Sequence, residues 1–122
     1  VKTGSITAEM VKYFTNTFLA TKVSFANEMK QICDGLNIDY DKVVEYSTYD
    51  ERLGKSHWAV PGPDGKLGFG GSCFPKDLNA LIHLARNLET SLNTIGGAWD
   101  TNLDVRPEED WKELKGRAVV DE

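Results

Sequence analysis

Large apolar side chains recur three, four or seven positions apart along the first third of the chain. This spacing places them on one face of an α-helix, and they are Met10, Phe14, Phe18, Phe25, Met29, Ile32 and Leu36. Neither Pro nor Gly interrupts residues 5–34. We therefore predict a long helix that has Ser5 or Thr7 as its N-terminal cap, Glu9 in its first turn and Gly35 at its end.

The length of this helix bears on how the chain assembles. At 1.5 Å per residue, a helix of about 30 residues is roughly 45 Å long. A domain of this size does not need such a helix for its own core, because tertiary packing of one apolar face already stabilises a much shorter one. Long helices of this kind usually pack against something larger, often a second copy. The pattern therefore favours a homodimer paired through this helix.

Further helices are predicted over residues 41–49, 75–89 and 91–103, with a short one around Trp111 and Leu114. Asp41 would cap the first of these, and Pro75 suits the first turn of the second. Residues 50–72 form a long loop rich in Gly and Pro, and long loops within compact domains are often functional. The predicted fold class is all-α.

The composition is that of one globular domain. The chain has 122 residues, 40% hydrophobic and 27% charged, with a formal net charge of -5. This charge provides no basic surface for nucleic acid or an anionic membrane, and no apolar run approaches the roughly 20 residues needed to span a bilayer. The two cysteines, Cys33 and Cys73, do not make a disulfide framework. The composition favours a cytoplasmic protein with reduced thiols.

Most of the candidate chemistry lies in residues 68–77, which read Gly-Phe-Gly-Gly-Ser-Cys-Phe-Pro-Lys-Asp. Glycine lets the backbone turn sharply or approach a ligand closely. Pro75 puts Cys73 at or just before a helix N-terminus, where free N–H groups and the helix dipole favour a thiolate, as does nearby Lys76. Asp77 follows one turn later and could orient a water beside a covalent intermediate. Cys73 is therefore a candidate nucleophile.

The residue chemistry of this stretch leaves other interpretations open. A cysteine before a helix is more often a small buried residue than a catalyst. A phosphate-binding loop fits poorly, because Cys73 stands where the pattern G-x-G-x-x-G has its third glycine. Cys33 lies within the apolar stripe of the long helix, so we expect it in the core.

Lys12 and Asn16 form a second candidate group. They are four residues apart, so they share one helix face and can reach the same ligand, and Asn27 follows three turns later on nearly the same face. Taken alone, such residues usually form a solvated face. His57 and His83 have no partners at metal-ligand spacing, so no metal site is predicted.

These segments, taken in order, resemble the central domain of the UDP-glucose/GDP-mannose dehydrogenase family. The matching segments are residues 8–16, 19–28, 50–54 and 68–77, and the resemblance covers roughly residues 5–103. It implies a helical domain like the C-terminal part of 6-phosphogluconate dehydrogenase, over residues 1–105. Residues 106–122 would be a C-terminal tail or the start of a further segment.

The family oxidises C6 of a nucleotide-linked hexose from alcohol to carboxylate with two NAD molecules. The resemblance implies that Cys73 attacks the C6 aldehyde, and that hydride loss from the thiohemiacetal gives a thioester. Lys12 would hold the negative charge that develops on the C6 oxygen, supported by Asn16. Asp77 would position the water that hydrolyses the thioester.

The resemblance implies binding roles as well. Phe69 and Gly70 of the glycine-rich loop would lie against the sugar nucleotide, and His57 would lie near it. Lys76 would lie close to the cofactor. Arg52 matches the arginine that, in relatives, reaches the substrate of the neighbouring subunit across the dimer.

A full family member also has an N-terminal Rossmann domain that binds NAD, and no G-x-G-x-x-G strand–helix unit occurs in these residues. The chain would therefore hold about half an active site, and we expect that alone it does not turn over substrate. The implied substrate is UDP-glucose, with GDP-mannose or a UDP-N-acetylhexosamine as alternatives. A non-catalytic helical dimerisation module is the alternative from a different class.

Overall fold

The computed structural model describes residues 2–113, and every regular element in that range is helical. The helices are α1 (Lys2–Gly35), α2 (Tyr40–Ser47), α3 (Cys73–Asn87) and α4 (Asn93–Val105), with 3-10 turns at Glu51–Leu53 and Asp110–Glu113. The all-α prediction is confirmed for this part of the chain. The short helix predicted near the end is the second 3-10 turn, and Leu114 lies outside the described residues.

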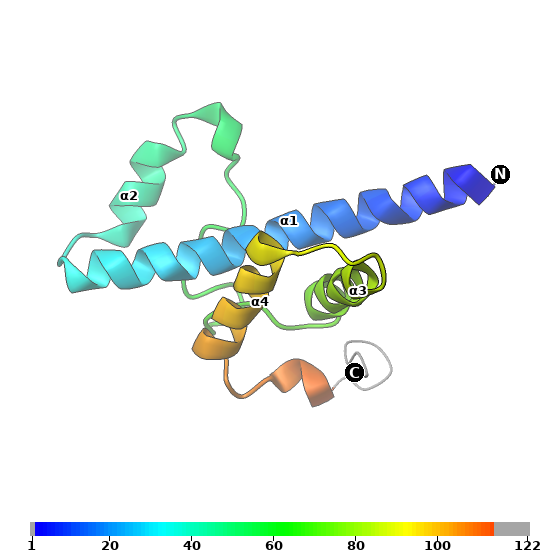
Figure 1. Ribbon diagram of the computed structural model, residues 1–122. Coiled ribbons are helices and arrows are strands. Elements are labelled where there is room, and N and C mark those ends of the chain that lie inside the picture. Colours follow the sequence, from blue (N-terminus) through cyan, green and yellow to red (C-terminus); the bar gives the residue numbers. More distant parts are fainter. Residues whose placement is uncertain (1, 114–122) are drawn as a thin grey trace.

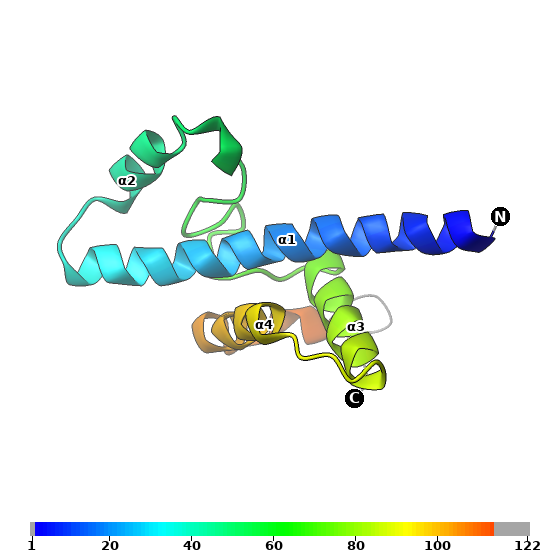
Figure 2. The same cartoon turned by 45° about the horizontal axis from the view of Figure 1, so that its top comes forward.

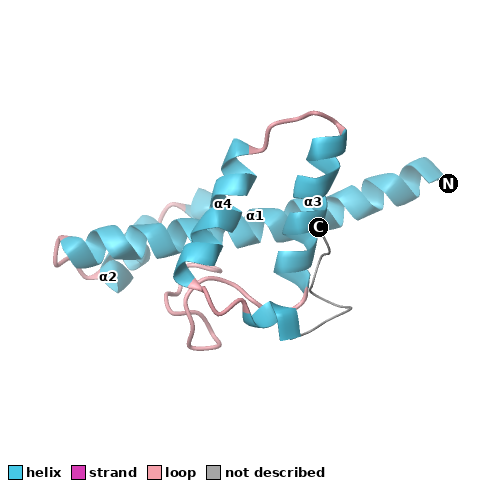
Figure 3. Ribbon diagram, turned by 60° about the horizontal axis from the view of Figure 1, so that its bottom comes forward, coloured by secondary structure: helices cyan, strands magenta, loops and turns pink. Residues whose placement is uncertain are grey.

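Helix α1 is the axis on which the other elements are arranged. Figure 1 shows α2 and the first 3-10 turn on one side of α1, with α3 and α4 on the other. Figure 2 keeps this division, and in Figure 3 α3 and α4 lie side by side across α1. The N-terminal turns of α1 extend beyond all the other helices, and every residue from Gly4 to Lys12 is exposed. Only the later turns of α1 therefore contribute to the packed part of the chain.

The predicted start of α1 is wrong. The backbone is already helical at Lys2, so Ser5 and Thr7 lie inside the helix and cap nothing. Gly4 is the one weak helix former in this stretch, and a single glycine costs about 1 kcal/mol, which is too little to end a helix of this length.

The boundary between α1 and α2 is set by Asn37 and Asp39, and the prediction that Asp41 caps the second helix is wrong. Asn37, with φ 57°, occupies the left-handed position after α1, and the N–H of Ile38 donates to the carbonyl of Cys33 at 2.8 Å. Asp39 then caps α2 by accepting from the N–H of Asp41 at 3.0 Å. Asp41 itself stands in the first turn, where its charge favours the helix dipole.

Two apolar clusters hold the other elements on α1. The first joins the C-terminal half of α1 to α2 and the long loop through Ala26, Cys33, Tyr40 and Val60. Cys33 is 4% exposed, which confirms its predicted place in the core. The second cluster joins the middle of α1 to α3, α4 and the glycine-rich loop, and its members are Ala20, Phe69 and Leu78 with partly buried Val23, Phe74, Ile82, Ile95 and Trp99. This second cluster therefore includes residues on both sides of Cys73, Phe69 in the loop and Phe74 in α3.

Residues that follow α4 also pack onto the domain. Trp111 is buried, and its ring centroid lies 5.2 Å from that of Trp99 on α4. The boundary predicted after residue 105 stays a prediction. No helix among residues 2–113 is long and apolar enough to cross a membrane.

Candidate active site

A buried carboxylate brings α1 and α3 together. Asp77, in the second turn of α3, is 1% exposed, and its Oδ2 accepts a hydrogen bond of 2.7 Å from Nδ2 of Asn16. Nζ of Lys12, one turn before Asn16 on α1, lies 4.0 Å from Oδ1 of Asp77. The shared face predicted for Lys12 and Asn16 therefore points at α3, not into solvent alone.

One oxygen of this carboxylate lacks a hydrogen bond. Oδ1 of Asp77 is buried and has no hydrogen-bond partner among the described residues. A buried acceptor without a partner typically costs about 1–3 kcal/mol, so native structures rarely keep one without a function or a bound water. Chemically, this oxygen can accept a hydrogen bond or a proton from a small molecule held beside the Lys12 ammonium.

Cys73 is the first residue of α3, so its predicted place at a helix N-terminus is confirmed. Its side chain is exposed, and Sγ lies 3.9 Å from Oγ of Ser72. Ser72 occupies the N-cap position without making a side-chain cap hydrogen bond. The side chain of Ser72 therefore does not cap the first N–H groups of α3. These N–H groups lie next to the exposed thiol of Cys73, four residues before Asp77.

Two asparagines fix the backbone that leads to Cys73. Oδ1 of Asn102 accepts from the N–H of Phe69 at 2.7 Å, and Nδ2 of Asn102 donates to the carbonyl of the same residue at 3.0 Å. Oδ1 of Asn27, on α1, accepts from the N–H of Gly68 at 3.2 Å. A methyl group on Gly68 would collide with the Asn102 amide, and Gly68 also has φ 67°. This position therefore requires glycine for two reasons.

A buried arginine completes the support of the loop. Arg106 follows α4, is 2% exposed, and hydrogen-bonds Asp110, Asp64 and the carbonyl of Leu67. The hydrogen bonds from Arg106 hold the pKa of Asp110 well below its usual range. Burial raises the pKa of Asp64, but the hydrogen bond from Arg106 and further contacts outweigh it, and the net shift is downward.

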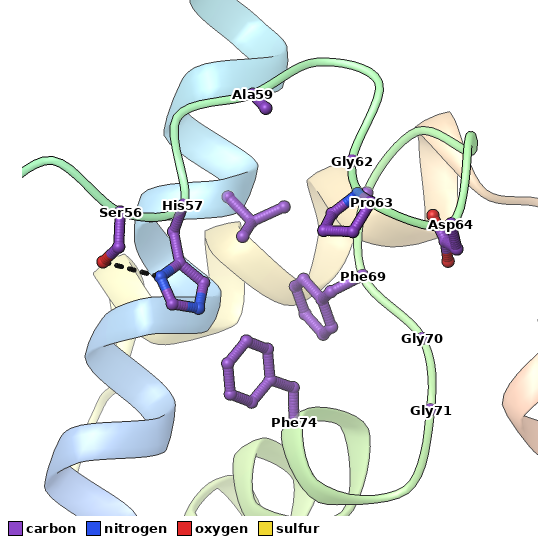
Figure 4. A pocket seen from close by; sticks show the side chains of 12 residues that line it. Ser56, His57, Ala59, Gly62, Pro63, Asp64, Phe69, Gly70, Gly71 and Phe74 are labelled. Atoms are coloured by element: carbon purple, nitrogen blue, oxygen red, sulfur yellow. Dashed lines mark hydrogen bonds between the residues drawn. The ribbon is translucent and has the colours of Figure 1, made fainter.

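An apolar cavity of about 440 Å³ opens beside the loop. Figure 4 shows the rings of His57, Phe69 and Phe74 converging on it, with Pro63 and the backbone of Gly70 along the opposite wall. The Phe69 and Phe74 rings meet edge to face at 6.0 Å between centroids, and His57 lies 5.8 Å from Phe74. Cavities of a few hundred Å³ with apolar walls and a few polar groups are typical of small-molecule sites.

Comparison with known proteins decides the family. The model of the UDP-glucose/GDP-mannose dehydrogenase family, central domain, matches residues 6–104. The chain belongs to this family.

Individual relatives agree with the family match. The chain is 40% identical over 121 residues to a UDP-glucose 6-dehydrogenase of Haloferax volcanii, covering 99% of this chain and 27% of that protein. It is 39% identical over 106 residues to the UDP-glucose 6-dehydrogenase TuaD of Bacillus subtilis, covering 87% of this chain and 22% of that protein. The chain thus spans about a quarter of the length of these curated relatives.

A solved structure supports the fold. The chain superposes with a TM-score of 0.70, at 39% sequence identity, on a UDP-glucose dehydrogenase from the hyperthermophilic archaeon Pyrobaculum islandicum. The match covers 78% of this chain and 21% of that one. The helical architecture is therefore that of the central domain in the dehydrogenase family.

Six of the residues predicted from the family resemblance fall into two places. Lys12, Asn16 and Asp77 meet, and the cavity is lined by His57, Phe69 and Gly70. Although Phe69 lines the cavity, it is only 5% exposed, because much of its ring belongs to the second apolar cluster. Lys76 is exposed in the first turn of α3 and makes no ion pair with any residue between 2 and 113.

Arg52 does not join these groups within one copy of the chain. Its turn lies on the other side of α1 from α3, and its exposed guanidinium pairs with Asp50 at 2.6 Å. The turn itself is anchored by Lys22, whose Nζ donates to the carbonyl of Leu53 at 3.0 Å and lies 4.6 Å from the centroid of the Trp58 ring. Burial lowers the pKa of Lys22, which is held without a carboxylate partner among the described residues.

Asn102 and Arg106 are the residues that sequence reasoning missed. Their spacing of four was a usable signal, because it places two polar side chains on the same side of the chain, Asn102 in the last turn of α4 and Arg106 directly after it. That signal named no partner, since Phe69 and Leu67 lie more than thirty residues earlier in the chain.

Proposed function

We propose that this chain is the catalytic-cysteine domain of an NAD-dependent UDP-glucose 6-dehydrogenase, to which it contributes Cys73, Lys12, Asn16 and Asp77. The observation that carries the proposal is the contact of Asn16 and Lys12 with a buried Asp77 that lies one turn beyond an exposed thiol. A merely structural helix pair would not need an exposed cysteine at a helix N-terminus beside a carboxylate with an unused lone pair.

The first part of the chemistry centres on the thiol. The Cys73 thiolate forms a bond from Sγ to C6 of the substrate aldehyde, and the carbonyl electron pair moves to the C6 oxygen. The Lys12 ammonium and the Asn16 amide stabilise this negative charge. NAD, when bound, supplies the acceptor for the hydride that then leaves C6, and the carbon stays attached to Sγ as a thioester.

The second part uses the free oxygen of Asp77. A water that hydrogen-bonds Oδ1 of Asp77 gives a proton to that carboxylate as its oxygen attacks the thioester carbon, the C–S bond breaks, and the sulfur leaves as a thiolate. The remaining acidic proton passes to solvent. The products are the carboxylate and the original Cys73. The missing hydrogen bond at Oδ1 supports this role, because a water at that position would satisfy it.

The substrate and the cofactor would be bound by different residues near Cys73. The cavity lined by His57, Phe69 and Gly70 is large enough for part of a sugar nucleotide and opens at the loop that precedes Cys73. The exposed ammonium of Lys76 can bind an anionic group of a cofactor, and the larger part of the NAD site would be contributed by a separate Rossmann domain. The names of the relatives favour UDP-glucose over GDP-mannose or a UDP-N-acetylhexosamine.

The nucleophile can be tested on the chain itself. We would add the C6 aldehyde of UDP-glucose, labelled with ¹³C at C6, and look for the thiohemiacetal carbon by NMR. We expect an adduct with the unaltered chain and with Cys33→Ser, whose cysteine is buried, and none with Cys73→Ala. The absence of an adduct in the unaltered chain, or an equal one in Cys73→Ala, would contradict the proposal. We also expect no steady NADH production from UDP-glucose and NAD by this chain alone.

We also propose that two copies pair through α1. Its large exposed side chains recur four or seven apart and include Phe14, Phe18, Phe25, Ile32 and Leu36. Helical spacing puts them on the opposite side of α1 from Ala20, Ser24 and Asn27, which contact α3, α4 or the glycine-rich loop. The N-terminal turns of α1 also extend beyond the other helices. A second copy is the occupant that this length and periodicity suit. Pairing would also give exposed Arg52 a neighbouring site to reach.

The pairing can be tested at Phe18. Full burial of a phenylalanine contributes about 1.5–3 kcal/mol, so burying the exposed 58% of Phe18 in both copies contributes about 1.7–3.5 kcal/mol per dimer. Phe18→Ala should therefore raise the dimer dissociation constant by about 20-fold or more in sedimentation equilibrium. Leu88→Ala, at an exposed position at the end of α3, is the control and should leave it unchanged. A monomeric unaltered chain, or equal effects of the two substitutions, would refute pairing through α1.

A further inference from the structure

We propose that Arg106 is a positioning residue for Cys73, which acts by holding the glycine-rich loop on the path that leads into α3. The inference rests on the proposed function of Cys73. It concerns a residue outside the stretch that the family model matches, which ends at residue 104.

The guanidinium of Arg106 is held from three directions. Nε and Nη2 each donate to a different oxygen of Asp110 at 2.8 Å, which fixes the plane of the group. Nη2 also donates to Oδ2 of Asp64 at 2.8 Å, and Nη1 donates to the carbonyl of Leu67 at 3.2 Å. Since a bidentate pair constrains orientation as well as distance, the Arg106 side chain has one defined position.

The loop backbone lies directly against this guanidinium at Gly70. A Cβ added to Gly70 would come within 2.5 Å of Nη2 and 2.8 Å of Cζ of Arg106. Gly70 does not have a positive φ, so its backbone conformation is one that any residue adopts. The guanidinium, not the backbone angle, is therefore what requires glycine here.

The contacts of Asn102 and Arg106 with the loop reach to within a few residues of Cys73. Asn102 fixes Phe69 through both backbone groups, and Arg106 fixes the carbonyl of Leu67 and the position of Gly70. Only two residues then remain before Cys73. The direction from which the chain enters α3, and with it the place of Sγ, is thus set by Asn102 in the last turn of α4 and by Arg106 directly after that helix.

The ionic character of the Arg106 network favours a role in positioning the loop over a role in stabilising the fold. A buried ion-pair network often contributes no more to stability than apolar side chains of similar volume, because desolvation of the charges offsets their attraction. What the network adds is direction: each hydrogen bond has a preferred angle, whereas an apolar contact does not. Asp64, at the cavity wall, and Leu67, in the loop, are thereby tied to one another through a single side chain.

The test compares Arg106→Met with Lys112→Met, an exposed cation that follows Trp111. Far-UV circular dichroism checks that each variant is folded, and the readout is the ¹³C aldehyde adduct together with the rate of Cys73 alkylation. We expect Arg106→Met to lose the adduct by at least about tenfold while it stays helical, since displacement of a reacting atom by about 1 Å can cost a hundredfold. Lys112→Met should match the unaltered chain. A folded Arg106→Met that keeps the adduct within about twofold overturns the inference.

A double-mutant cycle with Gly70→Ala gives a second test of the inference. Gly70→Ala alone should displace the loop and reduce the adduct, whereas Gly70→Ala should have little further effect once Arg106→Ala has removed the guanidinium. Guanidinium ion added to Arg106→Ala at a concentration too low to denature should restore part of the adduct. Additive effects of the two substitutions, without rescue, would overturn the inference. Failure of the unaltered chain to form any adduct would instead count against the function proposed for Cys73.

Discussion

Asn102→Ala should be among the most destabilising single substitutions in the domain. The side chain of Asn102 is 0% exposed and pairs with both backbone groups of Phe69. Its removal leaves a buried N–H and a buried carbonyl without partners. Each such group costs about 1–3 kcal/mol.

Two smaller effects of Asn102→Ala on stability have opposite signs. Alanine is a better helix former than asparagine by up to about 0.7 kcal/mol, which offsets part of the loss. The vacated volume adds a further cost, because the packing contacts of the side chain are lost. We therefore expect a decrease of about 2–4 kcal/mol in the free energy of unfolding, a large fraction of the 5–15 kcal/mol typical of a domain.

The measurement is urea denaturation followed by far-UV circular dichroism. All variants must be compared at one protein concentration, because pairing through α1 would make stability depend on concentration. Asn93→Ala is the matched control, since Asn93 is exposed in the first turn of the same helix, and it should change stability by less than about 0.5 kcal/mol. A loss below about 1 kcal/mol for Asn102→Ala, or equal losses in the two variants, would refute the argument.

Three further predictions concern the core, acid stability and one histidine. Leu78→Ala removes a fully buried side chain and should cost about 2–5 kcal/mol in urea denaturation, whereas Leu88→Ala at an exposed site should cost little. Because hydrogen bonds from Arg106 lower the pKa of Asp110 in the folded state, the stability that this pair contributes is present above the unfolded-state value near 3.9 and is lost as the pH falls further. Asp110→Asn should therefore show a shallower loss of stability on acidification below about pH 4 than the unaltered chain, and an identical slope would contradict this. Burial, and then the charge of a neighbouring lysine, lower the pKa of His57, so its NMR titration midpoint should lie below the ordinary value of about 6.5.

The sequence was sufficient for features that depend on local rules. Pro75 in a first turn located Cys73 at the start of α3, and the i, i+4 rule put Lys12 and Asn16 on one face. Helix ends were less predictable, because several neighbouring residues were each suitable as the cap. Asp39 and Asp41 are equally good caps in isolation, and only the direction of the chain after Asn37 selects the first.

Features that depend on distant segments could not be predicted. The apolar stripe of α1 was correctly read as helical, but periodicity does not say which apolar residues meet the domain's own core and which stay exposed. Likewise, Asn102 and Arg106 look like ordinary polar residues until the loop is folded against them. Their role depends on backbone groups that present no sequence pattern, since every residue has an N–H or a carbonyl to offer.

The unsupported N-terminal turns of α1 have a consequence for hydrogen exchange. Residues 4–12 are all exposed, and their amides are held only by the helix itself, so they should open locally at low free energy, whereas the turns around Ala20 and Ser24 open only with the domain. Lys12 lies at the boundary between the two regimes. The Lys12 ammonium, which faces Asp77, therefore lies at the edge of a helical stretch that would become more stable if another molecule packed against it. Slow amide exchange before residue 12 would report that such a cover has formed.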